Sequence, residues 1–108
     1  MKLIHKDLTK TRWFKFSLIE QMANIGSEIF RTISGQNKKQ DYMQAFERSL
    51  ELFDLTIVDP KNKMRLKEIL RCRELWCDYI VGDNQYHQND AMWQNYFYAF
   101  NWAARKNL

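Results

Sequence analysis

The side chains that could carry catalysis or bind a metal are few in this chain of 108 residues. Its two Cys are Cys72 and Cys77, and its two His are His5 and His87. On a helix, the five-residue spacing turns the Cys side chains about 140° apart, so they cannot form a disulfide with each other. They also lack the Cys-x-x-Cys spacing of zinc sites. We therefore expect both thiols to be free, with no metal site and no cofactor.

The sequence also lacks the groupings on which enzymes depend. It contains no His-Glu-x-x-His motif, no glycine-rich nucleotide loop and no grouping of a Ser or Cys nucleophile with a His. A di-metal carboxylate bundle needs Glu-x-x-His pairs, and neither His follows a Glu at that spacing. We expect a protein that is not an enzyme, has no catalytic residues and takes no small-molecule substrate.

Basic side chains gather in separate segments. Residues 1–15 hold five Lys and Arg against one Asp, and residues 61–73 hold six against one Glu. The whole chain has a net charge of +4, so its other segments together are acidic. Such segregation can create a basic face that meets an acidic partner, and an equally good interpretation is two solvated segments on the surface of the bundle. The candidate nucleic-acid-binding residues are Lys10, Arg12, Lys15, Lys61, Lys63, Arg65, Lys67 and Arg71.

The second basic segment contains a helical pattern. Lys63, Lys67 and Arg71 follow i, i+4 spacing and would form one stripe on a helix. A stripe of this kind can follow the phosphates of a nucleic acid without reading its sequence. An equally good interpretation is a solvated helix face on which Arg71 pairs with Glu68 or Glu74.

Aromatic residues crowd the last part of the chain. Six of them lie within ten residues: Trp93, Tyr96, Phe97, Tyr98, Phe100 and Trp102. The row from Trp93 to Phe100 suits a core, whereas Tyr98 and Trp102 fall on a different side of a helix. Exposed aromatic rows are typical of protein interfaces, because rigid rings bury much area at a low entropic cost. We expect Tyr98 and Trp102 to contact another subunit, with base stacking as the alternative.

Arg73 lies between the apolar rows of its predicted helix. Its side chain could run along apolar surface toward water, or it could pair with a carboxylate of another subunit. We count Arg73 with Tyr98 and Trp102 among the predicted oligomer-interface residues.

Segments with helical periodicity position these residues. Apolar side chains recur at helical spacing over residues 11–34, 40–58, 60–81 and 89–105. We expect Gly35 to end the first helix, and Asp59 to cap the third with Pro60 at its first position. Asn89 or Asp90 is expected to cap the fourth.

The first predicted helix carries further packing signals. Gly26 lies among apolar residues, where the missing side chain would let a neighbouring helix approach closely. The aromatic residues Trp13, Phe14 and Phe16 beside Lys15 could meet a membrane or RNA. We favour the interpretation that they form a hydrophobic staple and enter the core.

Short polar connections between these segments favour antiparallel neighbours. We expect an all-α protein in which residues 11–108 form an up-down-up-down four-helix bundle, preceded by a basic tail or arm over residues 1–10. The hydrophobic share of 45% and the aromatic share of 15% predict a packed core rather than disorder. No apolar run approaches the roughly 18 residues of a membrane span, and no signal peptide is recognisable. A soluble, cytoplasmic protein without membrane contact is therefore expected.

Three parts of the sequence resemble a group of short helical bacterial proteins. They are residues 13–28 (WFKFSLIEQMANIGSE), residues 45–52 (AFERSLEL) with 59–62 (DPKN), and residues 96–105 (YFYAFNWAAR). In architecture and charge this group is similar to the four-helix-bundle accessory proteins of diversity-generating retroelements, the accessory variability determinant family. The resemblance implies a ring-like homo-oligomer that assists a reverse transcriptase and contacts its template RNA through basic surfaces.

The expected function is accordingly that of a non-catalytic, oligomeric accessory protein. It would bind RNA and a protein partner, a retroelement reverse transcriptase. The alternative is a protein-only interaction or scaffold module, similar to an antitoxin, which does not bind nucleic acid.

Overall fold

The computed structural model describes residues 10–106, and the regular secondary structure of this part of the chain is all helical, without strands. The α-helices are α1 (Lys10–Trp13), α2 (Leu18–Asn37), α3 (Met43–Ile57), α4 (Leu66–Ile80) and α5 (Asp90–Lys106), and η1 (Pro60–Arg65) is a 3₁₀ helix. The predicted all-α class is therefore confirmed. Of the predicted basic tail, Lys10 belongs to α1, and residues 1–9 lie outside the described residues.

The first predicted helix, over residues 11–34, is interrupted. Helix α1 ends at Trp13, the chain turns, and α2 begins after Ser17. The Glu20 amide donates a hydrogen bond to the Ser17 hydroxyl at 3.1 Å, and the Ser17 amide donates to the Glu20 carboxylate at 3.0 Å. This capping box satisfies amide groups that would otherwise lack partners at the helix start. The expectation of one continuous helix was wrong because apolar side chains keep their spacing across the turn.

Gly35 does not end α2, which continues to Asn37. A Cβ atom at Gly35 would lie 2.9 Å from the Cβ atom of Tyr42, so the glycine allows the turn after α2 to pack against the helix. The residue of this turn with a left-handed backbone is Lys39, at φ 54°. The glycine therefore serves close packing, and its predicted role as a helix stop was wrong.

The third predicted helix, over residues 60–81, consists of two parts. Asp59 caps it as predicted, since its carboxylate accepts a hydrogen bond from the Lys61 amide at 3.1 Å. The first six residues nevertheless form η1, and the α-helix begins only at Leu66. A 3₁₀ helix has about 3.0 residues per turn, so the i, i+4 row from Lys63 to Lys67 is not continuous. Within α4, Lys67 and Arg71 keep that spacing.

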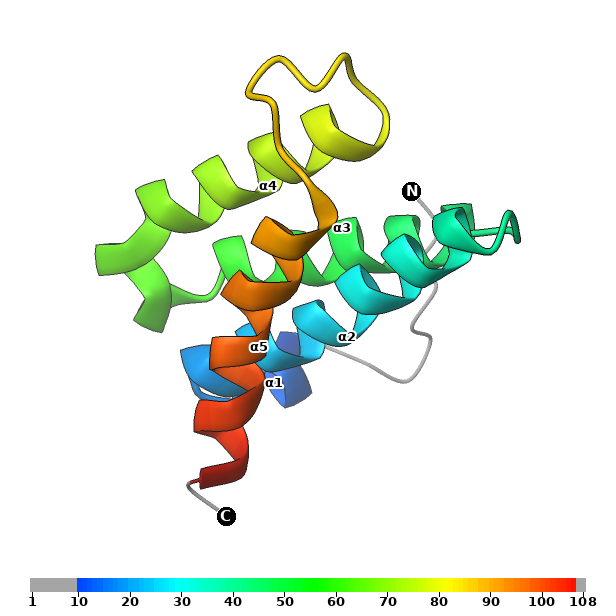
Figure 1. Cartoon of the computed structure of the whole chain (residues 1–108). Coiled ribbons are helices and arrows are strands. Elements are labelled where there is room, and N and C mark those ends of the chain that lie inside the picture. The colour runs from blue at the N-terminus through cyan, green and yellow to red at the C-terminus, as the bar shows by residue number, and fades with distance from the viewer. Residues whose placement is uncertain (1–9, 107–108) are drawn as a thin grey trace.

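The helices pack around one core. Helices α2 and α3 lie side by side and run in opposite directions, α4 packs on α3, and α5 crosses α2 (Figure 1). At this crossing, a Cβ atom on Gly26 would lie 3.1 Å from the Phe97 Cβ atom, as the predicted close approach requires. The up-down-up-down bundle is not confirmed, because α5 runs across α2 rather than along it.

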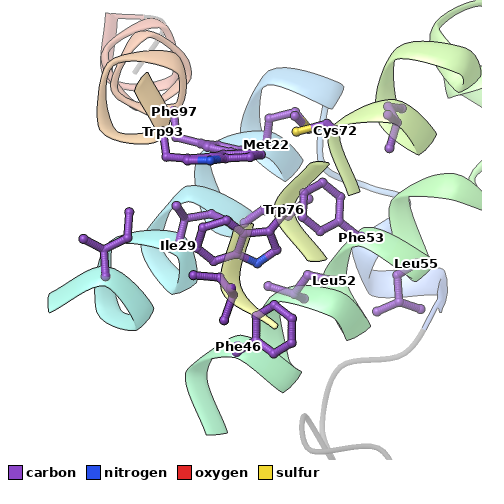
Figure 2. Packing of buried hydrophobic residues seen from close by; sticks show 14 of the residues in the cluster. Met22, Ile29, Phe46, Leu52, Phe53, Leu55, Cys72, Trp76, Trp93 and Phe97 are labelled. Carbon is purple, nitrogen blue, oxygen red and sulfur yellow. The ribbon is translucent and has the colours of Figure 1, made fainter. Parts of the chain in front are cut away.

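Aromatic rings dominate the core between α3, α4 and α5. Figure 2 shows Trp76 at the centre of this cluster, between Phe46 and Trp93. The Trp76 ring centroid lies 5.0 Å from that of Trp93 and 6.0 Å from that of Phe46. The indole N–H of Trp76 donates to the Ser49 hydroxyl at 2.9 Å, so its polar group is satisfied in the core.

Helix α5 begins and ends as the sequence predicts. The Asn89 side chain accepts a hydrogen bond from the Met92 amide at 2.9 Å, and Arg105 and Lys106 lie in the last turn. None of the described helices combines the length and the apolar character needed to cross a bilayer.

Candidate functional site

The ammonium group of Lys61 joins the two basic segments of the chain. It forms an ion pair with the Asp59 carboxylate and donates a hydrogen bond to the Phe14 carbonyl oxygen at 3.1 Å. It also lies 6.0 Å from the centroid of the Phe14 ring. Because Phe14 directly follows α1, this contact brings α1 and the start of η1 together. We call the exposed cations of this region the basic edge: Lys10, Arg12, Lys15, Lys61 and Lys63.

A buried polar network underlies the basic edge. Its centre is the Gln21 amide, which donates hydrogen bonds to Asp59 Oδ2 at 2.8 Å and to the Trp13 carbonyl oxygen at 3.1 Å. The Asn62 amide in turn donates to Gln21 Oε1 at 2.8 Å and to the Thr56 carbonyl oxygen at 3.0 Å. All five residues have exposed fractions of 4% or less. The network therefore ties α1, α2, α3 and η1 together beneath the Lys61 ammonium.

Trp13 connects the network to α3. Its indole N–H donates to the Thr56 hydroxyl at 3.0 Å, and that hydroxyl donates to the Leu52 carbonyl oxygen at 2.8 Å. The ring itself is 2% exposed, so the predicted entry of this aromatic residue into the core is confirmed. Buried polar groups with complete partners fix one arrangement of the elements that carry them. The buried network therefore fixes the relative positions of the segments from which the cations of the basic edge project.

Asp59 is the charged member of the network. Burial alone would raise the pKa of its carboxyl group, but hydrogen bonds from Lys61 and Gln21 outweigh burial and hold this pKa below its ordinary value. Asp59 therefore stays ionised, and its charge is matched by the Lys61 ammonium. Lys61 was predicted as a nucleic-acid contact, and the structure gives its side chain an internal partner as well.

The remaining predicted cations lie along η1 and α4. Arg65 pairs with Glu68 at 3.4 Å, and Arg71 pairs with Glu74 at 3.5 Å, which is one of the two pairings expected for it. The Arg71 guanidinium also lies 4.8 Å from the centroid of the exposed Tyr86 ring. Exposed pairs of this kind contribute little to stability, so either Arg could exchange its partner for a phosphate.

Lys63 and Lys67 are exposed, and neither forms an ion pair within the described part of the chain. Lys63 lies two residues after Lys61, about a third of a turn away around η1, and we count it with the basic edge because it is an exposed cation of the same short helix. Lys67 lies on the first turn of α4, beyond the end of η1.

Arg73 has a carboxylate partner within its own chain. Its Nε donates to Asp54 Oδ1 of α3 at 2.9 Å, and its side chain is 32% exposed. The pair links α4 to α3, so the partner expected from another subunit is supplied internally. A role for Arg73 in an oligomer stays a prediction.

An apolar groove lies between α4 and α5, because the backbones of these helices approach each other closely at few positions, although Trp76 of α4 and Trp93 of α5 are in contact. Two adjoining hollows of about 310 and 200 Å³ make up this α4–α5 groove and share Glu68 and Tyr96. The first is lined mainly by Cys72, Leu75, Met92 and Trp93, and the second by Leu18, Ile19, Met22, Ile69 and Phe100. Sequence reasoning missed this groove.

Two titratable groups of the α4–α5 groove, the Cys72 thiol and the Tyr96 hydroxyl, favour their neutral forms. Burial raises the pKa of the Cys72 thiol to about 12, with the nearby Glu68 charge adding to the effect. Burial also raises the pKa of the Tyr96 hydroxyl, and the charges of Cys72 and Glu68 act in the same direction. Since the thiolate is the nucleophilic form, Cys72 is a packing residue rather than a reactive one.

Helix α5 presents different side chains to the core and to solvent. Trp93 and Phe97 are buried, whereas Tyr98 is 61% and Trp102 is 57% exposed. The Lys106 ammonium lies 5.3 Å from the centroid of the Trp102 ring. The predicted separation of the aromatic residues onto two sides of the helix is confirmed, and the subunit contact itself stays a prediction.

Among residues 10–106, no three His, Cys, Asp or Glu side chains come together in a way that could hold a metal ion. Comparisons with protein-family models, with curated proteins and with solved structures find no match to this chain.

Proposed function

We propose that the protein is a non-catalytic RNA-binding protein that holds the phosphate backbone on its basic edge. The observation that carries this proposal is the hydrogen bond from the Lys61 ammonium to the Phe14 carbonyl oxygen. This contact brings the two basic segments together, so their cations can form one surface. Lys10 on α1, Lys15 in the turn after α1 and Lys63 on η1 belong to segments tied to the buried network, so the spacing of their backbones is maintained without a ligand. Preorganised cations lose little conformational entropy on binding, which favours affinity.

The basic edge suits backbone contacts rather than the reading of bases. Its side chains are Lys and Arg, which neutralise phosphates and release their counterions without discriminating between sequences. The resemblance to accessory proteins of diversity-generating retroelements makes a template RNA the proposed ligand and a reverse transcriptase the proposed protein partner. A reverse-transcriptase gene and a repeat pair beside the gene for this chain would support that assignment.

A salt titration of RNA binding tests the proposal. We expect the variant with both Lys15→Ala and Lys63→Ala to bind a labelled single-stranded RNA at least about tenfold more weakly than the wild type at 100 mM salt. The slope of log affinity against log salt should fall by about two, because two phosphate contacts are lost. Fluorescence anisotropy between 50 and 200 mM salt measures both quantities.

The matched control removes the same number of positive charges from another part of the surface. Lys38 and Lys39 are exposed in the turn after α2, at the opposite end of that helix from the basic edge (Figure 1). The variant with Lys38→Ala and Lys39→Ala should bind RNA nearly as well as the wild type. Equal losses in the two variants would show that net charge alone drives binding, and the absence of binding at 50 mM salt would refute the proposal.

The α4–α5 groove favours a second candidate function, that of a protein-only interaction module. Its lining is apolar, and α4 and α5 leave it open between them. The proposed occupant is the apolar face of a partner's amphipathic helix, which anchors in grooves of this kind through residues one turn apart. Such a complex depends on apolar burial, so it should persist at 0.5 M salt, where RNA binding through the basic edge is lost.

A pair of methionine variants tests the groove. Met92 lines the groove and is 52% exposed, whereas Met64 on η1 is 93% exposed and lies outside it. We expect Met92→Glu to abolish binding of the apolar fluorescent dye anilinonaphthalene sulfonate to the folded protein, and Met64→Glu to leave it unchanged. Dye fluorescence that is equal in the two variants would argue against a groove that accepts apolar groups.

A further inference from the structure

The outward face of α5 carries no charge along most of the helix. Residues 91–104 contain no Asp, Glu, Lys or Arg, although many of their side chains are exposed. The exposed members include Ala91, Gln94, Asn95, Tyr98 and Trp102. Depletion of charge together with enrichment in aromatic residues distinguishes the centre of protein interfaces from ordinary surface. This face therefore has the composition of a surface that is covered by another protein.

The spacing of these residues matches that of a helix-pairing seam. Ala91, Asn95, Tyr98 and Trp102 follow one another at intervals of four, three and four residues. This alternation is the one that keeps side chains facing a partner along two packed helices. The seam lies on the side of α5 opposite Phe97, which packs against α2 at Gly26.

The charges at the ends of α5 indicate what the partner is. Asp90 is the first residue of the helix, and Arg105 and Lys106 lie in its last turn. Tyr98 is the middle residue of the 17. A second copy of α5 that runs antiparallel, with its centre at Tyr98, would bring the first turn of each copy, which holds Asp90, level with the last turn of the other, which holds Arg105 and Lys106. Asp90 also accepts hydrogen bonds from the Tyr79 hydroxyl and from Asn37 Nδ2 at 3.2 Å, and its carboxylate oxygens have lone pairs for a further donor.

We propose that the outward face of α5 pairs antiparallel with α5 of a second copy of this chain, about a two-fold axis at Tyr98. Trp102 of each copy then inserts between Ala91, Gln94, Asn95 and Tyr98 of the other, where Ala91 leaves room for its ring. The opposed helix dipoles and the paired end charges both favour this direction. Each helix is roughly 25 Å long at 1.5 Å per residue, so the interface is small and the dimer is weak.

New cysteines on α5 test the geometry in the full chain, with the wild type, which already carries the free thiols Cys72 and Cys77, as the reference for cross-linking. In the antiparallel pair the two copies of residue 98 adjoin, so Tyr98→Cys should form a covalent dimer under mild oxidation. The two copies of residue 106 would lie roughly 24 Å apart, so Lys106→Cys should stay monomeric on a non-reducing gel. A parallel pair would cross-link at both positions. Cross-linking through Lys106→Cys, or none through Tyr98→Cys, overturns the proposal.

Sedimentation of variants without new cysteines gives an independent measurement. We expect the wild type to dimerise reversibly at micromolar to millimolar concentrations, and Trp102→Ala to raise the dimer Kd at least about tenfold. Met92→Ala, a change on the groove side of the same helix, should leave the dimer Kd unchanged. A wild type that stays monomeric throughout this range, or equal losses in the two variants, contradicts the proposal.

Discussion

Replacement of Trp76 by alanine is expected to lower the free energy of unfolding by about 4 kcal/mol. Trp76 is fully buried, its ring lies among those of Phe46, Tyr79 and Trp93, and its indole N–H donates to Ser49. The substitution removes these contacts and leaves a cavity. The buried Ser49 hydroxyl loses the donor that it accepts from, although it still donates to the Phe46 carbonyl oxygen. Urea denaturation followed by circular dichroism measures the change.

Trp102→Ala is the matched control for this prediction. The same change in size occurs on a side chain that is 57% exposed, so the free energy of unfolding should fall by less than about 0.5 kcal/mol at protein concentrations that keep the chain monomeric. Similar losses at Trp76 and Trp102 would contradict the assignment of Trp76 to the centre of the core.

Asp59→Ala is expected to lower the free energy of unfolding by about 3 kcal/mol. Its carboxylate accepts hydrogen bonds from Gln21 and from the Lys61 amide, and it pairs with the Lys61 ammonium. Loss of the carboxylate leaves the buried Gln21 amide with one acceptor fewer and removes the cap of η1. Urea denaturation again measures the effect, with Asp83→Ala in the exposed loop before α5 as the control.

The contribution of Asp59 to the free energy of unfolding should also depend on pH, and it should fall as the pH is lowered. The pKa of this carboxyl group is lowered in the folded protein from its ordinary value of 3.8. A lowered folded-state pKa gives stability that is complete above the unfolded-state pKa and is lost as pH falls through the folded-state pKa. The difference in stability between the wild type and Asp59→Asn should be constant from about pH 7 to pH 5 and shrink below about pH 4. A difference that grows on acidification would contradict the ion pair.

Local sequence signals predicted the helical class but not every boundary. Asp59 and Asn89 cap helices as their residue types predict, because a cap depends on atoms two or three residues away. The Ser17 and Glu20 box was equally readable, but the apolar spacing from Trp13 onward concealed the break before it. Gly35 was misread because its function depends on Tyr42, which packs against it only in the folded chain.

The candidate site depends on contacts between distant residues, which no local pattern contains. The basic segments were visible in the sequence, but Lys61 meets the Phe14 carbonyl oxygen 47 residues earlier in the chain. Gln21 lies on the buried face of α2. A polar residue among apolar neighbours in the sequence indicates a buried hydrogen-bond network, so this part of the site could have been predicted. The α4–α5 groove could not be predicted, since it results from the angle at which α5 crosses α2.

If α1 and η1 together form one RNA-binding surface, NMR chemical-shift mapping will show both segments responding to the same RNA. Backbone amide signals of the full chain are followed while a single-stranded RNA is added at low salt. We predict that the signals of residues 10–15 and of residues 61–67 shift together, with one common affinity, while those of residues 38–42 do not. Shifts confined to one of the two basic segments, or to the lining of the α4–α5 groove, would contradict a single RNA-binding surface.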